Sequence, residues 1–153
     1  MTKTVADAMT ADPRTAAPRT TAVDAAKIML EEDVGSVPVV NADGMLVGIV
    51  TDRDIALRVV AAGRSPQATY VEDIATVHPH CAMADESLDD AYEKMAAWRI
   101  RRLPVVDEDQ HLVGMLAQAD LVQELKDKKA GQLVEEISQP GEPAYTNQDV
   151  GIR

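Results

Sequence analysis

The chain has 153 residues, a formal net charge of −11 and a pI near 4.6. Because nucleic-acid affinity depends largely on Lys and Arg side chains that neutralise phosphates, a chain this acidic is not expected to have nucleic acid as its main partner. It contains 46% hydrophobic residues but no Phe and only 3% aromatic residues, so its core must consist of aliphatic side chains and Met, in one compact domain.

The first half of the chain predicts six elements in order. They are a short helix at residues 5–9, a Pro-containing extended strand, a longer helix at residues 21–32, two strands at residues 36–41 and 46–51, and a closing helix from residue 52 onward. Thr21 has the hydroxyl expected of an N-cap, and Asp24 stands three residues later, as in the first turn of a helix. The two strands flank Asn-Ala-Asp-Gly, which predicts a tight turn and therefore a hairpin.

The second half predicts the same elements again, at residues 71–75, 87–98, 103–107, 112–117 and from 118 onward. Residues 5–58 align with residues 71–124 without a gap, at an offset of about 66 residues. We therefore expect a pseudo-dimer of two repeats, at residues 1–66 and 67–130. Residues 131–153 are expected to form a short amphipathic segment and a flexible tail.

A single cysteine excludes an intramolecular disulfide framework. The chain has no apolar run near the roughly 20 residues that span a bilayer, and its start lacks a signal-peptide pattern. We expect a soluble protein of a reducing cytoplasm.

The helices carry more apolar residues than one sheet needs. Residues 22–30 are apolar except at Asp24 and Lys27, and residues 55–62 are apolar except at Arg58. Two explanations stay open, namely burial on both sides by the two repeats, or contact with a second chain in a homodimer.

The first candidate site is the junction between the second strand and the closing helix. Thr51 and Asp54 begin this helix in the first repeat, and Ala117 and Asp120 are their counterparts. A carboxylate there can accept both hydroxyls of a ribose, close to free backbone N–H groups. Thr51 and Asp54 also have the spacing of a capping pair. Because Ala117 lacks the hydroxyl while Asp120 is kept, capping cannot be the whole reason for the second carboxylate.

The second candidate site is a basic cluster formed by Arg99, Arg101 and Arg102 in an otherwise acidic chain, and its counterpart at residues 33–38 has no positive charge. Guanidinium groups bind phosphate through paired hydrogen bonds. Alternatively, these side chains cover apolar surface and pair with carboxylates.

Other chemistry has weaker support. His78, His80 and Cys81 are metal-ligand types, and only His111 adds another imidazole. No His and carboxylate arrangement marks Cys81 as a nucleophile, and the phosphate-loop, dinucleotide and hydrolase motifs are absent from the sequence. We expect neither an enzyme nor an obligatory cofactor.

Taken together, the repeat, the two Pro-Val-Val strands, the two Leu-Val-Gly strands and the Thr-x-x-Asp junction resemble the CBS domain. Two in tandem resemble a Bateman module, and the resemblance covers residues 4–126. A free-standing pair of this size is similar to small bacterial CBS-pair proteins.

The resemblance implies an α/β (α+β) fold of two βαββα repeats, packed sheet to sheet with pseudo-two-fold symmetry and with helices outside. It also implies clefts between the repeats that commonly bind AMP, ADP or ATP, and in some members S-adenosylmethionine or NAD-type ligands.

Carried over by motif, the resemblance gives each candidate residue a role. Asp54 and Asp120 would hold ribose hydroxyls, with Thr51 nearby. The adenine slot would be lined by Thr15, Ala17, Val37 and Pro38, and the phosphates would meet Arg101 and Arg102. Ala117 departs from the family pattern, as does Arg102 where many members have His, so the Asp54 cleft is expected to bind in preference to the Asp120 cleft.

We therefore expect a dimeric sensor of adenine nucleotides that acts on a separate effector protein. The alternatives are a ligand-free dimeric scaffold that docks another protein and a redox or metal sensor built on Cys81 and its histidines.

Overall fold

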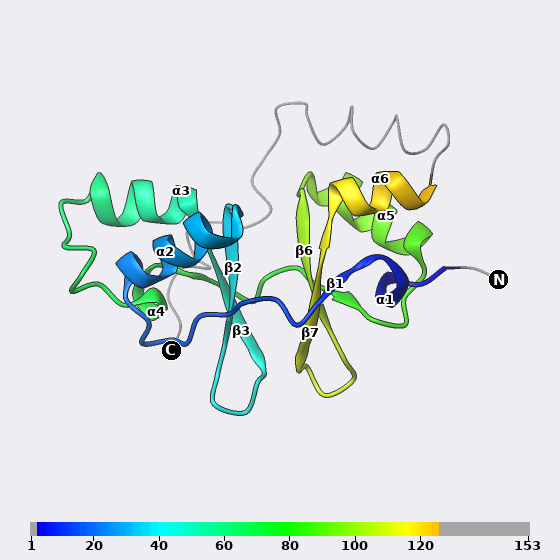
Figure 1. Ribbon diagram of the computed structural model, residues 1–153, viewed down its shortest axis with the longest axis horizontal. Coiled ribbons are helices and arrows are strands. Elements are labelled where there is room, and N and C mark those ends of the chain that lie inside the picture. Colours follow the sequence, from blue (N-terminus) through cyan, green and yellow to red (C-terminus); the bar gives the residue numbers. More distant parts are fainter. Residues whose placement is uncertain (1–2, 126–153) are drawn as a thin grey trace. The chain divides into compact units, whose positions relative to one another are not determined.

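The computed structural model of the chain describes residues 3–125, which fold into two compact units (Figure 1). Residues 14–79 form the continuous unit. Residues 3–13 and 80–125 together form the discontinuous unit. Every helix within residues 3–125 is too short or too polar to cross a membrane. The predicted segments at residues 131–153 lie outside the described residues.

Two long helices begin at the predicted N-caps. Thr21 precedes α2 (Ala22–Glu32), and its Oγ1 accepts the backbone N–H three residues on at 3.3 Å. Ser87 precedes α5 (Leu88–Trp98) and accepts the equivalent N–H at 3.1 Å. These bonds satisfy amides that would otherwise have no partner in the first helical turn, so both predicted helix starts are confirmed.

The sheet of the continuous unit is built around the first predicted hairpin. β2 (Ser36–Val40) and β3 (Leu46–Thr51) pair antiparallel, and the short β4 (Thr76–Val77) pairs antiparallel with the other side of β3. The order is therefore β2-β3-β4.

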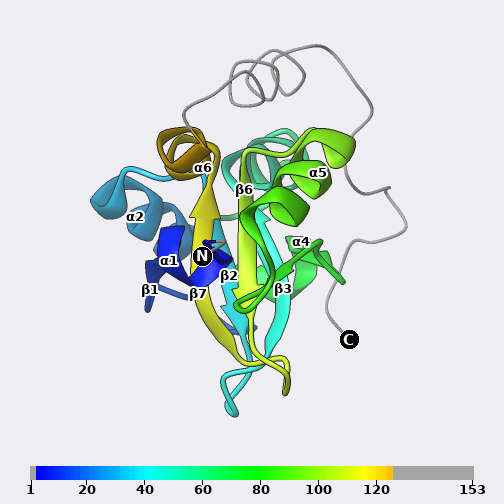
Figure 2. The ribbon, with the colours of Figure 1, turned by 90° about the vertical axis from the view of Figure 1, so that its right-hand side faces the viewer.

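The sheet of the discontinuous unit is built around the second hairpin. Its four strands lie in the order β1-β7-β6-β5, and Figure 2 shows β6 and β7 side by side. Their bounds are β1 (Thr10–Ala11), β5 (Ala82–Met83), β6 (Arg102–Val106) and β7 (Leu112–Ala117). β5 runs parallel to β6, whereas the other pairs are antiparallel.

Shorter helical elements complete both units. They are α1 (Val5–Ala8), α3 (Asp52–Ile55), a π-helical segment at Ala56–Val60, α4 (Val71–Ile74) and α6 (Gln118–Leu125). The mixed α/β class and the predicted order of elements are confirmed, while the π-helical segment was not predicted.

Relative to the sequence repeats, the compact units exchange two short strands, β1 and β4, which we call the arms. β1 comes before the first hairpin in the chain but pairs with β7, with Thr10 opposite Met115. β4 comes before the second hairpin but pairs with β3, with Thr76 opposite Ile49. The compact units therefore change after residues 13 and 79. The repeat boundary near residue 66 describes the periodicity of the sequence and stays a prediction.

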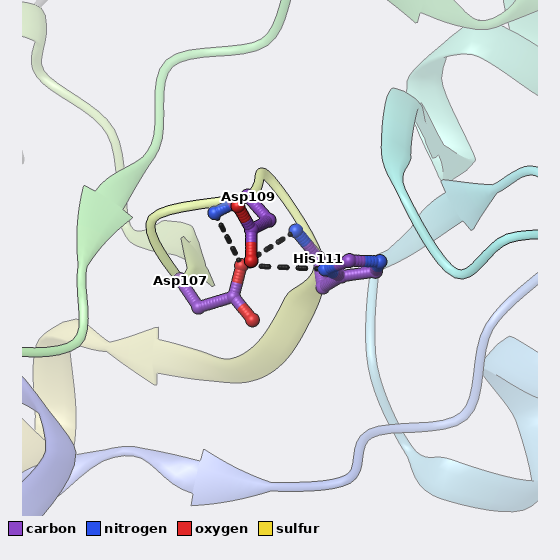
Figure 3. A group of neighbouring side chains, drawn as sticks. All are labelled: Asp107, Asp109 and His111. Carbon is purple, nitrogen blue, oxygen red and sulfur yellow. Dashed lines mark hydrogen bonds and ion pairs between the residues drawn. The ribbon is translucent and has the colours of Figure 1, made fainter.

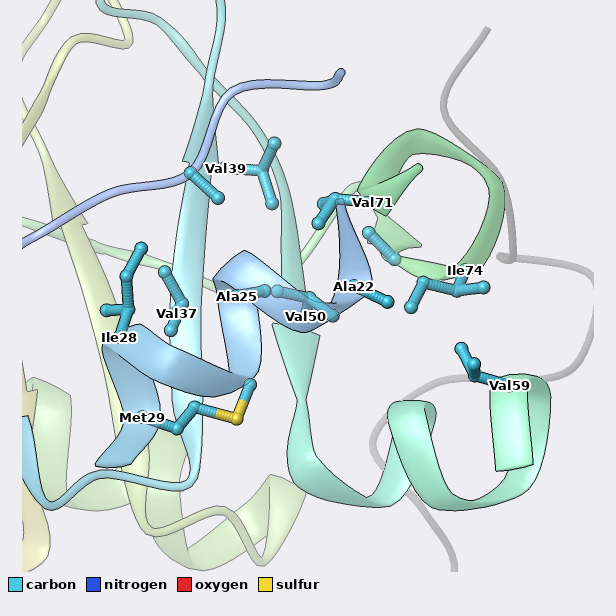
Figure 4. Close-up of a cluster of buried hydrophobic side chains, with 12 residues drawn as sticks. Ala22, Ala25, Ile28, Met29, Val37, Val39, Val50, Val59, Val71 and Ile74 are labelled. Carbon is cyan, nitrogen blue, oxygen red and sulfur yellow. The ribbon is translucent and has the colours of Figure 1, made fainter. Parts of the chain in front are cut away.

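Each unit has an aliphatic core on one face of its sheet. In the continuous unit, α2, the π-helical segment and α4 pack on this face through the side chains of Ala22, Ala25, Ile28, Met29, Val37, Val39, Val50, Val59, Val71 and Ile74 (Figure 4). In the discontinuous unit, α1, α5 and α6 pack in the same way, through Val5, Leu88, Ala91, Tyr92, Met95, Leu103, Val105, Leu116 and Leu121. The two cores use the aliphatic side chains that the composition predicted.

Gly114 allows β1 to lie close to β7. A Cβ atom at this position would approach the Met9 side chain and lie 2.9 Å from the carbonyl oxygen of Thr10. The flexible Met9 side chain can move, whereas the Thr10 oxygen belongs to the paired strand. A glycine is therefore required by the backbone of the arm.

We predict that Gly114→Ala lowers the free energy of unfolding by about 1–3 kcal/mol, because the added methyl group overpacks the contact with β1. Urea unfolding measures this loss. The substitution should remain destabilising in a Met9→Ala background, since the Thr10 oxygen is still present. Equal stability of Gly114→Ala and the wild type would contradict the close approach.

Candidate functional site

The two strand-to-helix junctions share one backbone geometry. In the continuous unit, the Asp52 amide donates to the Gly35 carbonyl oxygen at 2.9 Å. In the discontinuous unit, the Gln118 amide donates to the Arg101 carbonyl oxygen at 2.8 Å. These residues correspond in the repeat, so the chemical difference between the two junctions comes from their side chains.

Asp54 makes hydrogen bonds with both of its carboxylate oxygens. Oδ2 accepts the Thr51 amide at 2.8 Å, and the Asp54 amide donates to Thr51 Oγ1 at 3.0 Å, which completes a capping box. Oδ1 accepts Nη1 of Arg58 at 2.7 Å. The same Nη1 also donates to the Ile74 carbonyl oxygen at 3.0 Å.

The Asp54 carboxylate is also buried, with 8% of its side chain exposed. Burial raises the pKa of this carboxyl above its ordinary value, against the hydrogen bonds from Thr51 and the positive charge of Arg58. The capping role that the sequence left open is confirmed by these contacts. A role for Asp54 in ligand binding stays a prediction.

Asp120 occupies the equivalent position in the discontinuous unit, but its neighbouring residues are different. It is partly buried, and within residues 3–125 its carboxylate has no hydrogen bond or ion pair. Ala117 provides no hydroxyl, and the counterpart of Arg58 is Glu124, which pairs with Lys3. This junction therefore leaves its aspartate without the partners that hold Asp54.

The four residues predicted to line the adenine slot lie on β2 and on the segment beside it in the continuous unit. The Ala16 amide donates to the Pro38 carbonyl oxygen at 2.9 Å, which places Thr15 and Ala17 beside β2. Thr15 and Ala17 are exposed, whereas Pro38 is buried. Val37 is only 1% exposed and packs in the hydrophobic core (Figure 4). The side chain of Val37 therefore serves the core.

The predicted phosphate residues, Arg101 and Arg102, are both exposed at the start of β6. Within the described part of the chain, neither forms an ion pair, in contrast to Arg14, Arg58 and Arg64, which pair with carboxylates. The β6 and β7 register places Arg102 opposite Ala117. Two uncompensated guanidinium groups thus lie at the same end of the hairpin as the junction with Asp120.

Within residues 3–125, one group of three potential metal ligands has ligand atoms that all lie within 4.8 Å of one another (Figure 3). It consists of Asp107, Asp109 and His111. Asp107 Oδ1 accepts the backbone amides of Asp109 at 2.9 Å and His111 at 3.0 Å. These bonds hold the pKa of Asp107 below its usual range. In the first hairpin, Asn41 makes the same two bonds with its side-chain oxygen. The arrangement is therefore explained by the turn.

The other candidates for metal or redox chemistry do not form a ligand cluster within the described residues. The ring of His80 stacks on Trp98, with 3.9 Å between the ring centroids. Burial raises the pKa of the Cys81 thiol, which disfavours the reactive thiolate. Cys81 and the histidines therefore have no geometric support as a sensor.

Arg58 is the residue of the junction that sequence reasoning missed. It appeared only as a polar interruption of an apolar helix, although its spacing of four residues from Asp54 is that of a helical ion pair. This spacing is the signal that could have found it.

Comparison with known proteins identifies the family. The CBS domain family model matches residues 5–61 and again residues 71–127. The chain belongs to the CBS domain family. The CBS domain-containing protein YhcV of Bacillus subtilis is 41% identical over 135 residues, which cover 88% of this chain and 94% of that protein. The predicted resemblance to small bacterial proteins with tandem CBS domains is confirmed.

Solved structures of similar CBS proteins include complexes with adenosine compounds. A structure of CBSX2 in complex with AMP has a TM-score of 0.70 and 30% identity, and the match covers 80% of this chain and 96% of that one. The CBS domain pair of MJ0100, in complex with 5′-methylthioadenosine and S-adenosyl-L-methionine, has a TM-score of 0.72 and 30% identity, with 82% and 98% covered.

A third similar structure contains a metal. Hypoxic Response Protein I, with two coordinated zinc ions, has a TM-score of 0.73 and 31% identity, and the match covers 79% of this chain and 98% of that one. The related Hypoxic response protein 1 of Mycobacterium tuberculosis is 31% identical over 137 residues, which cover 90% of this chain and 95% of that protein.

We predict that Arg58→Met lowers the free energy of unfolding by about 1–3 kcal/mol near neutral pH, because the buried Asp54 carboxylate loses its cationic partner. The exposed Arg53→Met is the matched control and should change stability by less than about 0.5 kcal/mol. Chemical unfolding of both variants measures the difference.

The penalty of Arg58→Met should decrease at acid pH. Without Arg58 the folded-state pKa of Asp54 rises further, so the variant is least destabilised below the unfolded-state pKa and loses stability as pH increases through the raised pKa. A penalty that is constant from acid to neutral pH would contradict the ion pair as its cause.

Proposed function

We propose that this protein is a non-enzymatic regulatory module that binds an adenosine-type ligand such as AMP, ADP or ATP. The observation that carries the proposal is the pair of CBS domains, together with the AMP complex of the similar protein CBSX2. A location in the cytoplasm and a separate effector protein belong to the same proposal.

The exposed arginines support an anionic ligand. The chain carries a net charge of −11, so an anion approaches it against the overall field. Arg101 and Arg102 provide a local exception because they have no carboxylate partner within the part that the structure describes. Their guanidinium groups are suited to phosphate oxygens, which accept paired N–H donors.

We predict that one or more of AMP, ADP, ATP and S-adenosylmethionine raises the midpoint of thermal unfolding. A ligand at about ten times its Kd stabilises the native state by about 1.4 kcal/mol, which corresponds to a shift of a few degrees. Differential scanning fluorimetry measures the shift. A panel without any shift would contradict the adenosine-ligand proposal.

Replacement of both arginines tests the phosphate contact. We expect Arg101→Gln with Arg102→Gln to weaken binding of the nucleotide by about tenfold or more, because charge-assisted hydrogen bonds are lost. Adenosine should bind the variant and the wild type equally. If the binding of adenosine and of the nucleotide weakened equally, this would contradict a contact between the arginines and the phosphates.

A solvent-facing strip on the continuous unit supports a homodimer. It consists of Ala56, Leu57, Val60 and Ala61, which follow the spacing of one helical face. Leu57 is 51% exposed and Val60 is 69% exposed. The counterpart of Leu57 in the second repeat is Gln123, and the discontinuous unit has no large hydrophobic side chain among its exposed described residues.

The same strip favours the second candidate function, a ligand-free dimeric scaffold that docks another protein. The two functions differ in their need for a ligand, because the scaffold would keep its partner interaction when no adenosine compound is present. The zinc ions of Hypoxic Response Protein I support the metal hypothesis. However, the group of potential ligands found among the described residues, at Asp107, is accounted for by the turn hydrogen bonds that Asn41 makes in the first hairpin.

We predict that Val60→Glu converts the protein to a monomer, because a carboxylate would be buried without a partner in the dimer contact. Light scattering coupled to gel filtration measures the mass in solution. Gln123→Glu, the exposed position that corresponds to Leu57, is the matched control and should remain dimeric. A wild type that is monomeric at every accessible concentration would contradict the dimer.

A further inference from the structure

We propose that residues 3–12, which we call the N-terminal segment, can leave their own chain and complete the same sheet in a second copy of this protein. Two chains that exchange their N-terminal segments would form a dimer through contacts that each chain already makes internally. This inference goes beyond the proposed function. It is also separate from the strip that contains Leu57 and Val60, because it concerns the edge of β7 that β1 covers.

The N-terminal segment is bound to the discontinuous unit along its length. The Val5 amide donates to the Glu86 carbonyl oxygen at 2.9 Å, and the Ala6 amide donates to the Ala84 carbonyl oxygen at 3.0 Å. The side chain of Val5 is fully buried in the core of this unit. β1, near the end of the segment, pairs with β7. A second copy has the same acceptors and the same core, so an exchanged segment would keep these contacts.

A short connection joins the N-terminal segment to the continuous unit. The Asp12 amide donates to the Val113 carbonyl oxygen of the discontinuous unit at 3.4 Å. The Ala16 amide already donates to the Pro38 carbonyl oxygen of the continuous unit, at 2.9 Å. Only three residues lie between Asp12 and Ala16, and the first of them is Pro13. The chain therefore changes from one unit to the other within a few residues.

The backbone at this connection is strained. Asp12 has a φ of 50°, in the left-handed region that is unfavourable for residues with a Cβ. It also precedes Pro13, and the residue before a proline is biased toward extended conformations. His78 repeats this conflict, with a φ of 50° before Pro79 at the second crossing between the units. Short connections under strain favour exchange, because an exchanged chain can extend at Asp12.

The edge of β7 is the site that fits the exchanged segment. Gly114 lies opposite Ala11, and a Cβ atom at Gly114 would lie 2.9 Å from the Thr10 carbonyl oxygen. The equivalent edge of β3 is already paired with β4, where Ile49 lies opposite Thr76. A second copy whose own N-terminal segment has left therefore offers β7, and not β3, to the incoming segment.

A cross-linking experiment on the full chain tests the exchange. One chain carries Thr10→Cys and the other Met115→Cys, and both carry Cys81→Ser, so that neither chain can form a disulfide within itself. Directly opposite residues of antiparallel strands are close enough for a disulfide, and Thr10 lies opposite Met115. We expect disulfide-linked dimers after the two chains are unfolded in urea and refolded together at high concentration. A denaturing gel without reductant measures them.

The matched control replaces Met115→Cys by Ile49→Cys. Ile49 is the equivalent position of the first hairpin and is buried to a similar extent, with 5% exposed against 7% for Met115. This control should give about tenfold less product or none, because a disulfide requires the two backbones to be adjacent. Equal cross-linking at both positions would overturn the inference. Absence of product with Met115→Cys protein that circular dichroism shows to be folded would also overturn it.

Two aspartates with nearly the same φ test the strained connection without new cysteines. Asp12→Gly removes the unfavourable conformation at the connection, whereas Asp33→Gly removes it at the end of α2, where φ is 53°. Both are made in a Val60→Glu background, which excludes the contact through the strip. Light scattering coupled to gel filtration compares each protein, refolded at high concentration, with a sample that was never unfolded.

We expect refolding to produce additional dimer in the Val60→Glu parent and in Asp33→Gly. Asp12→Gly should lower the association constant of this dimer by about tenfold or more, because the exchanged form then relieves less strain in each of its two chains. A parent that gains no dimer on refolding would overturn the exchange. Equal amounts of dimer in the two glycine variants would overturn the role of the connection at Asp12.

Discussion

The fold of this protein depends on the completion of each sheet by an arm from elsewhere in the chain. β1 pairs with the edge of β7 that faces away from β6, and β4 pairs with the edge of β3 that faces away from β2. A two-stranded hairpin is only marginally stable alone, so these short strands matter more than their length suggests. In the chain, each arm comes before the hairpin of the other unit. The chain therefore crosses from one unit to the other after residue 13 and again after residue 79.

The two units share a backbone more closely than they share side chains. Non-glycine residues with positive φ recur at equivalent positions, such as Asp33 at 53° and Arg99 at 54° at the ends of the long helices. Such conformations cost about 1–2 kcal/mol for residues with a Cβ. Their repetition in side chains of opposite charge shows that the backbone sets the conformation. The side chains could therefore diverge, and the junctions at Asp54 and Asp120 are where this divergence has chemical consequences.

Local signals in the sequence predicted the elements of the fold well. Thr21 and Ser87 marked helix starts because N-capping involves residues only three positions apart. The hairpins were predicted because each is closed by a short turn. The exchange of arms was not predictable in this way. The two repeats have the same pattern, so residues 10–11 are equally compatible with the strand of either hairpin, and the choice depends on long-range packing.

The candidate site was predicted in part. The repeat located both aspartates, and the resemblance to CBS domains assigned them a role. What the sequence could not give was the state of each carboxylate, because this depends on a third residue. Arg58 and Glu124 lie one turn beyond the aspartates, and they make the two junctions chemically different. The pattern also did not show that the side chain of Val37 lies in the core, and its place in an adenine slot stays a prediction.

The exchanged arms also bear on how such a chain could have arisen by duplication. A polypeptide ending near residue 66 would contain β2 and β3 without β4, and it would carry β1 without β7. One ancestral copy would thus have had an open strand edge and one arm that fits this edge in its own hairpin or in that of a second copy, and two copies could have completed each other's sheets by trading arms. The segment that is inherited as a repeat is different from the segment that folds as a unit.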